Sequence, residues 1–224
     1  GFTNLQLLKG ICIIDVPLTE LPMNIGLLKG LERLEVYNSK LESIPNSIGQ
    51  CSKLQELTLV DGNLKDIPKS VCDLKNLQTL KIKNHQILTL PNDIGGLSNL
   101  IYLYLNGNKL SSLPNSICDL NNLFTLTLAE NDLSELPKQI GRLSNLKLLA
   151  LQHNQLKKLP LGIFDLTSLQ GLSLKDNKLK TLPKQIADLQ NLVELDVRDN
   201  PFSSLDIDHY TKILINCRIK SNCC

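Results

Sequence analysis

The sequence predicts an α/β solenoid of stacked parallel strands, and three observations lead to this fold class. Apolar residues recur with a strict period of 23 residues through eight consecutive units that span 8–191. A proline stands at position 15 of every unit, from Pro22 to Pro183. Positions 4 to 6 of each unit alternate apolar, polar and apolar, which is typical of a half-buried strand. A fixed period of this length indicates a repeat architecture.

Each unit is expected to contain one strand and one short irregular segment. Positions 1, 4, 6, 11, 14, 18 and 21 are apolar in nearly every unit. Because proline cannot donate to a strand ladder, the strand must end before position 15. The rest of the unit has near-helical spacing but is too short for a stable helix, so a 3₁₀ or irregular segment is expected on the convex side. Stacking would bury the leucines and place parallel strands roughly 4.8 Å apart on a concave face.

The two ends of the chain are expected to differ from the regular units. The chain is predicted to be a single solenoid domain, 1–224, in which 1–7 end a truncated repeat and 192–224 hold a final partial repeat and a C-terminal cap. Asp208 is the expected N-cap of a capping helix, with an apolar face at Tyr210, Ile213 and Leu214. A last strand-like segment is expected to follow.

Position 9 divides the units into two groups. The last five units carry an asparagine there, which predicts a structural ladder of Asn108, Asn131, Asn154, Asn177 and Asn200. The first four units carry Val16, Ser39, Gly62 and His85 instead. An asparagine amide can satisfy buried backbone groups where the chain leaves the strand. Drift of terminal repeats and deformation toward a partner both explain the irregular units, and in either case the N-terminal half is expected to open first in hydrogen exchange.

The unit L-x-x-L-x-L-x-x-N-x-L-x-x-L-P-x-x-I-G-x-L-x-x-L, as at 123–146, resembles the 23-residue leucine-rich repeat family. Within that family the chain is most like the leptospiral proteins, whose C-terminal ends often run I-x-x-L-L-P-x-C-x-I; residues 210–219 are similar, with Ile215-Asn216 in place of Leu-Pro. Intracellular Ras-group leucine-rich repeat proteins share the unit and are the second candidate. The resemblance implies a horseshoe that binds partners on its concave face.

Strand alternation predicts which side chains face a partner. If positions 4 and 6 are buried, positions 3, 5 and 7 point to the concave side and positions 2 and 8 lie at its margins. The candidate partner-binding residues are therefore Glu35, Tyr37, Glu56, Lys81, Lys83, Tyr102, Tyr104, Asn106, Phe124, Leu148, Gln152, Lys175 and Arg198.

The strongest hypothesis for a binding hot spot lies in units 4 to 6. Tyr102, Tyr104 and Phe124 cluster there beside Lys81 and Lys83. Exposed aromatic residues are enriched at interface hot spots, because they bury a large area at a small entropic cost. The alternative is that tyrosine and threonine are simply good strand residues.

A second charged feature lies away from the concave face. Lysines gather along one edge of units 7 and 8, at Lys157, Lys158, Lys178, Lys180 and Lys184. They could attract an acidic polymer such as a sulphated glycan. The alternative is that they only solvate this edge.

The sequence gives no sign of catalysis, of a cofactor or of a metal site. The three histidines fall in different units, without metal-ligand spacing. Phosphate loops and nucleophile elbows are absent, and units of equal length leave no long loop for a closed pocket. The seven cysteines do not form a disulfide framework, although Cys217 could pair with Cys223 or Cys224.

These observations predict a non-enzymatic protein-binding module. The formal net charge of +2 argues against nucleic acid as a partner, and the sequence has no membrane-spanning stretch. The leptospiral resemblance favours a secreted or surface protein that binds a host protein. An intracellular signalling scaffold in the cytoplasm and a glycan binder are the alternatives.

Overall fold

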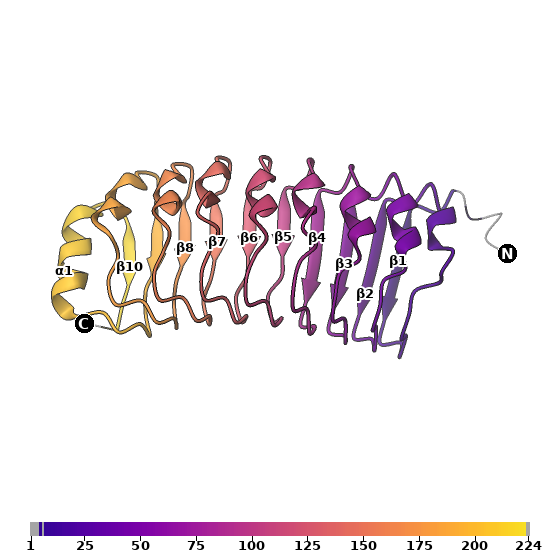
Figure 1. The fold of residues 1–224 in the computed structure, drawn as a ribbon, viewed down its shortest axis with the longest axis horizontal. Coiled ribbons are helices and arrows are strands. Elements are labelled where there is room, and N and C mark those ends of the chain that lie inside the picture. The colour runs from indigo at the N-terminus through magenta and orange to yellow at the C-terminus, as the bar shows by residue number, and fades with distance from the viewer. Residues whose placement is uncertain (1–4, 6, 223–224) are drawn as a thin grey trace.

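The computed structural model is an elongated, gently curved stack of repeats in which the strands lie side by side along the long axis (Figure 1). It describes residues 5 and 7–222. Ten strands form one parallel sheet in chain order, as the sequence predicts. They are β1 (Gly10–Ile14), β2 (Arg33–Tyr37), β3 (Glu56–Val60), β4 (Thr79–Lys83), β5 (Tyr102–Tyr104), β6 (Thr125–Thr127), β7 (Leu148–Ala150), β8 (Gly171–Ser173), β9 (Glu194–Asp196) and β10 (Arg218–Lys220).

The register stacks each position of the repeat on the same position of its neighbour. Leu57 pairs with Leu80, and Leu80 pairs with Leu103, so the apolar positions form continuous columns. These side chains are fully buried, while the residues between them face the other side of the sheet. The parallel sheet and its single long core therefore follow from the 23-residue period.

Short 3₁₀ segments cross the convex side and form the upper border in Figure 1. They are η2 (Ile25–Leu27), η3 (Asn46–Gln50), η4 (Lys69–Asp73), η5 (Ile94–Gly96), η6 (Asn115–Asp119), η7 (Ile140–Arg142), η8 (Leu161–Asp165) and η9 (Lys184–Asp188). Where the segment has five residues, the proline of position 15 precedes it in an extended conformation, as at Pro45 (φ −69°, ψ 145°). The isoleucine or valine of position 18 is buried in every one of these units, which ties the segment to the core.

The C-terminal end is covered by α1 (Ser204–Ile213), which lies across the last repeats in Figure 1. The expectation of a capping helix is met, but the predicted N-cap, Asp208, is wrong. Ser203 is the N-cap, and it forms a capping box with Asp206, so Asp208 lies within the helix. The hydroxyl of Tyr210 donates to the carbonyl of Leu182 and accepts from the N–H of the same residue, which fixes the helix on unit 8.

Two predictions concern residues outside the described part. The partial repeat expected at 1–7 falls mostly there, and so do Cys223 and Cys224, the candidate partners of Cys217. Cys51, Cys72 and Cys118 are buried free thiols. No helix in the described part of the chain has the length and apolar character needed to cross a membrane.

Candidate functional site

The sheet face brings the predicted partner-binding residues onto one surface. Each of them is at least partly exposed, whereas the alternating positions 4 and 6 of units 2 to 9 are buried under the sheet. The face is not uniform along its length. It divides into an acidic region, a cationic and aromatic region, a region of small side chains and a region of paired charges.

The acidic region lies on β2 and β3. The hydroxyl of Tyr37 donates to Glu35 Oε1 at 3.1 Å, and the hydroxyl of Thr58 donates to Glu56 Oε1 at 3.3 Å. Burial is the main cause that raises the pKa of Tyr37 to about 12, and the hydrogen bond to Glu35 is the second. Tyr37 therefore stays a neutral donor, and Glu35 has part of its hydrogen-bonding capacity filled within the sheet.

Three aromatic rings form a continuous patch on β5 and the start of unit 6, which we call the aromatic patch (Tyr102, Tyr104 and Phe124). The rings of Tyr102 and Tyr104 are nearly parallel, with centroids 6.3 Å apart, and Phe124 meets Tyr102 edge to face at 6.3 Å. Tyr102 is 37% exposed and Phe124 is 43% exposed. The patch thus packs its rings against one another while leaving apolar area exposed.

Two lysines on β4 border the aromatic patch. Lys81 is paired in register with Tyr104, and Lys83 lies two residues further along the same strand. Neither lysine makes an ion pair with a residue that the structure describes. Their ammonium groups are therefore available to an acidic side chain of a partner.

Small side chains follow the aromatic patch on β6 to β8. Thr125, Thr127 and Ala150 are almost fully buried on this face, and Gly171 has no side chain. Leu148 leans over this glycine, since a Cβ at Gly171 would lie only 2.8 Å from Leu148 Cδ1.

Two polar atoms near these small side chains lack partners. Thr127 Oγ1 and Gln152 Oε1 are buried without a hydrogen-bond partner within the described chain. Buried polar atoms of this kind are normally satisfied, so these two are exceptions within the stack.

The C-terminal part of the face carries charges that are already paired. Arg198 donates from Nε and Nη2 to the two carboxylate oxygens of Asp196, at 2.9 and 2.6 Å. Burial alone would raise the pKa of Asp196, but the hydrogen bonds and charge of Arg198 outweigh burial and lower it. Lys175 lies 3.6 Å from Asp199, and Lys220 lies 2.6 Å from Glu194. These residues offer less unpaired charge than Lys81 and Lys83.

Asparagine side chains on and beside this face also make bonds within the stack. Asn106 Oδ1 accepts a hydrogen bond from the N–H of Ala129, so its acceptor is used inside the stack. Each asparagine of position 9 bridges two units. Asn131 Nδ2, for example, donates to the carbonyls of Leu105 and Leu128, and its Oδ1 accepts from Leu110 N–H.

The sequence analysis missed a second asparagine ladder at position 23. These side chains donate to the backbone carbonyl of position 22 in the preceding unit, at 2.7 to 2.9 Å. The residues are Asn76, Asn99, Asn122, Asn145 and Asn191. Their recurrence at one position of the repeat is the signal that could have revealed them.

Position 8, treated above as a margin of the face, is a turn position. Its backbone is left-handed in every unit, with φ between 50° and 68°. The side chains there are short and polar in most units, and Asn38 donates to Asp15 and Asn84 to Asp61 across one repeat. Aspartate, asparagine and glycine tolerate this conformation, which explains their recurrence. Glu130 and His153 adopt it less easily.

Chemistry beyond binding finds little support in the described residues. No three histidine, cysteine, aspartate or glutamate side chains there lie close enough together to hold a metal ion. Several open grooves lie between neighbouring units on the loop and convex sides.

Two models of known families match this chain, and both describe leucine-rich repeats. A model described as a leucine-rich repeat region matches residues 92–195, and a model described as a leucine rich repeat matches residues 52–110. Together the two matches cover most of the regular units. No curated protein gives a significant match.

Solved structures extend the similarity over nearly the whole chain. A leucine-rich repeat protein of Leptospira interrogans is 29% identical over 96% of this chain and 72% of its own, with a TM-score of 0.50. A plant peptide hormone receptor, RGFR1, solved in complex with RGF2, is 30% identical over 96% of this chain but only 35% of its own, with a TM-score of 0.76. InlJ of Listeria monocytogenes, 19% identical over 100% of this chain and 46% of its own, has a TM-score of 0.83 and shows the shared fold.

Proposed function

Because this chain belongs to the leucine-rich repeat family, whose domains generally mediate protein–protein interaction, we propose that it binds a protein partner on the concave sheet face. The binding centre is the aromatic patch with Lys81 and Lys83 beside it. This family is generally non-enzymatic, and we propose that binding is the activity of this chain.

The observation that carries the proposal is the exposure of stacked aromatic rings on a rigid sheet. Aromatic side chains that are held in place lose little entropy on binding, and they gain from the burial of their apolar area. The two unpaired lysines add charge that selects a partner with acidic side chains near its contact residues.

The leptospiral similarity supports a host-directed partner and a surface or secreted location, while the shared repeat unit keeps a cytoplasmic signalling scaffold as the competing proposal. Protease treatment of intact cells separates the two. Loss of the protein from intact cells supports the surface location, and protection until the cells are lysed supports the scaffold.

Site-specific photo-crosslinking tests the concave face directly. A photoreactive phenylalanine analogue replaces Phe124 in one variant and Leu161, an exposed residue of η8 on the convex side, in the control. The binding proposal expects one defined crosslinked protein at position 124 and none at position 161. Equal crosslinking at both positions, or crosslinking at 161 alone, would contradict a concave binding face.

A further inference from the structure

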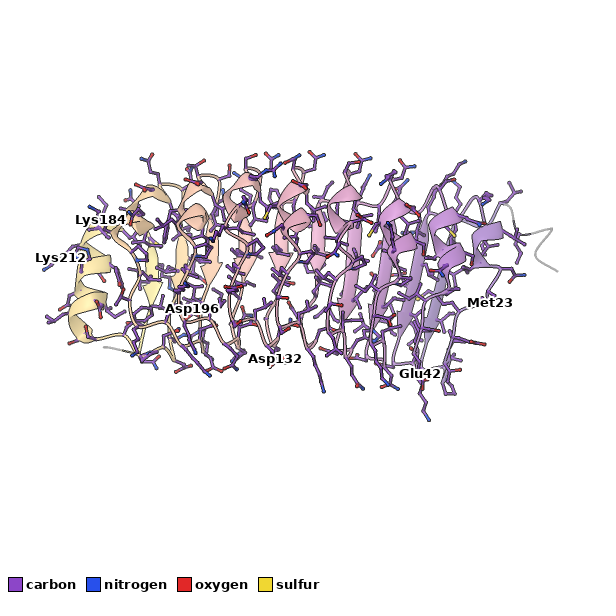
Figure 2. The ribbon with its side chains drawn as sticks, in the orientation of Figure 1. Met23, Glu42, Asp132, Lys184, Asp196 and Lys212 are labelled. Carbon is purple, nitrogen blue, oxygen red and sulfur yellow. The ribbon has the colours of Figure 1, made fainter. Side chains whose placement is uncertain are left out.

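The loops that leave each strand, at positions 10, 12 and 13 of the unit, form one edge of the solenoid, which we call the loop edge. Glu42 and Asp132 mark it along the lower border in Figure 2. In units 2 to 6 the loop edge mixes both signs of charge, at Lys40, Glu42, Lys65, Asp66, Lys109, Asp132 and Glu135. In units 7 and 8 it carries lysines and no carboxylate, at Lys157, Lys158, Lys178 and Lys180.

Three of these lysines meet at one groove. Lys157, Lys178 and Lys180 line a groove of about 490 Å³ together with Asn177 and Pro201. All three lysines are exposed, and none makes an ion pair with a described residue. The amide of Asn177 is engaged inside the stack, so the ammonium groups supply the charge of the groove.

The spacing of these charges suits a linear anionic polymer. Lys157 and Lys180 both occupy position 12 of adjacent units, so the positive charge repeats along the stack with the period of the repeat. Like charges held together without counter-charges repel one another, and an anion that bridges them relieves this repulsion. Lys184, which the sequence analysis placed in the same cluster, begins η9 on the upper border of Figure 2 and lies away from the groove.

We propose that the groove of Lys157, Lys178 and Lys180 on the loop edge binds a sulfated glycan. Nucleic acid fits less well, because no aromatic side chain lines the groove to stack on bases. An anionic membrane fits less well too, because units 7 and 8 present no large exposed apolar side chain on this edge. The site lies outside the concave face, so the glycan and the protein partner bind independently.

The test uses a heparin oligosaccharide as the probe, titrated into the whole chain at several salt concentrations. The triple variant K157Q/K178Q/K180Q is expected to bind heparin roughly tenfold more weakly. Its affinity should also depend less steeply on salt concentration, because the three lysine charges that salt would screen are absent. The matched control is K40Q/K65Q/K109Q, which removes the same net charge from exposed positions on the same edge. Its affinity is expected to stay within about twofold of the parent.

Several outcomes would overturn the proposal. Equal loss of affinity in both triple variants would mean that heparin responds only to net charge. Absence of heparin binding near physiological salt would reject the site. Equal or tighter binding of unsulfated hyaluronan, single-stranded DNA or phosphatidylserine vesicles would reject a sulfated glycan as the ligand. Thermal unfolding of each variant shows whether it is folded, and Tyr104→Ala is expected to leave heparin binding unchanged.

Discussion

His85 Nδ1 accepts a hydrogen bond from the backbone N–H of Leu64 at 3.2 Å. One unit later Asn108 Oδ1 accepts the equivalent bond from Ile87 N–H, also at 3.2 Å. The imidazole therefore performs half of the asparagine role at position 9. It does not perform the other half, because its Nε2 is buried without a hydrogen-bond partner, whereas Asn108 Nδ2 donates to the carbonyls of Ile82 and Leu105.

Replacing this histidine by asparagine should stabilise the protein. His85→Asn would keep the bond from Leu64 and would replace the buried Nε2, which has no hydrogen-bond partner, by an amide that can donate as Asn108 does, so we expect a gain of about 1 kcal/mol at pH 7. Urea unfolding measures it. The control is His209→Asn, at an exposed position of α1, which should change stability by less than about 0.5 kcal/mol. A loss of stability in His85→Asn would show that packing of the ring on Gly62 matters more.

The same histidine should make stability depend on pH. Burial lowers the pKa of His85 to about 4, although the carbonyl of Leu59 and the charge of Asp61 oppose the shift. In the unfolded chain the imidazole has its ordinary value near 6.5. Between these two values the unfolded state binds more protons, so stability is full above about pH 6.5 and is lost as the pH falls toward 4.

His85→Asn isolates this contribution from that of the carboxylates. Its advantage over the parent should grow by roughly 2–3 kcal/mol between pH 7 and pH 4, because the variant has no imidazole to protonate. Urea unfolding of both proteins across this range measures the difference. A difference that stays constant with pH would mean that His85 is not buried in its neutral form.

The repeat pattern predicts the fold more completely than it predicts the side-chain contacts on the concave face. The columns at positions 4 and 6 and the proline at position 15 define the parallel register, because each unit is an almost identical copy of its neighbour. The C-terminal end broke this regularity. Lys220 pairs in register with Asp196, which is 24 residues earlier, and this offset follows from α1 replacing a 3₁₀ segment. The ion pair between Lys220 and Glu194 could therefore not be predicted from the 23-residue period.

The N-cap of α1 and the stacking of the two tyrosines could be predicted from the sequence only in part. Ser203 and Asp206 have the spacing of a capping box, but the apolar pattern of the helix pointed to Asp208 as the N-cap. Alternation along β5 places Tyr102 and Tyr104 on the same side of the sheet. The stacking of their rings depends on side-chain rotamers and on Phe124 from the next unit, and the strand pattern carries no information about either.

The ladder at position 9 should contribute much more to stability than the ladder at position 23. Asn131→Ala would leave the buried N–H of Leu110 without a partner and would remove one of the two amide donors from each of the carbonyls of Leu105 and Leu128, so we expect a loss of about 2–3 kcal/mol. Asn122→Ala removes one exposed hydrogen bond to the carbonyl of Ser98 and should lose less than about 1 kcal/mol. Thermal and urea unfolding compare the two. Similar losses would contradict the idea that burial determines the value of each ladder.

Hydrogen exchange should show that the N-terminal units open first. The N–H of Leu133 donates to the buried side chain of Asn154 at 2.9 Å, whereas the N–H of Leu41 donates to Ser39 of its own unit at 3.3 Å. The side chain of Ser39 thus makes no bond to a neighbouring unit like that of Asn154, and Leu8, Ile11 and Ile13 pack only partly buried against the core. We expect the Leu41 amide to exchange faster than the Leu133 amide under native conditions, as measured by NMR. Equal protection factors along the solenoid would refute this prediction.

Removal of one ring of the aromatic patch should weaken binding without unfolding the protein. Tyr104 is paired with Lys81 in the sheet and stacked on Tyr102, but its side chain stays partly exposed. Tyr104→Ala is therefore expected to weaken binding of the partner found by crosslinking by about 1–3 kcal/mol, because hot-spot aromatics bury much of their area at an interface. The dissociation constant measured by calorimetry and the melting temperature report on the two effects separately.

Tyr37→Ala removes a tyrosine from the same face outside the patch, and it should change the affinity by less than about 1 kcal/mol. A lower melting temperature with unchanged affinity in Tyr104→Ala would instead show that the stacked tyrosines stabilise the fold and do not contribute to binding.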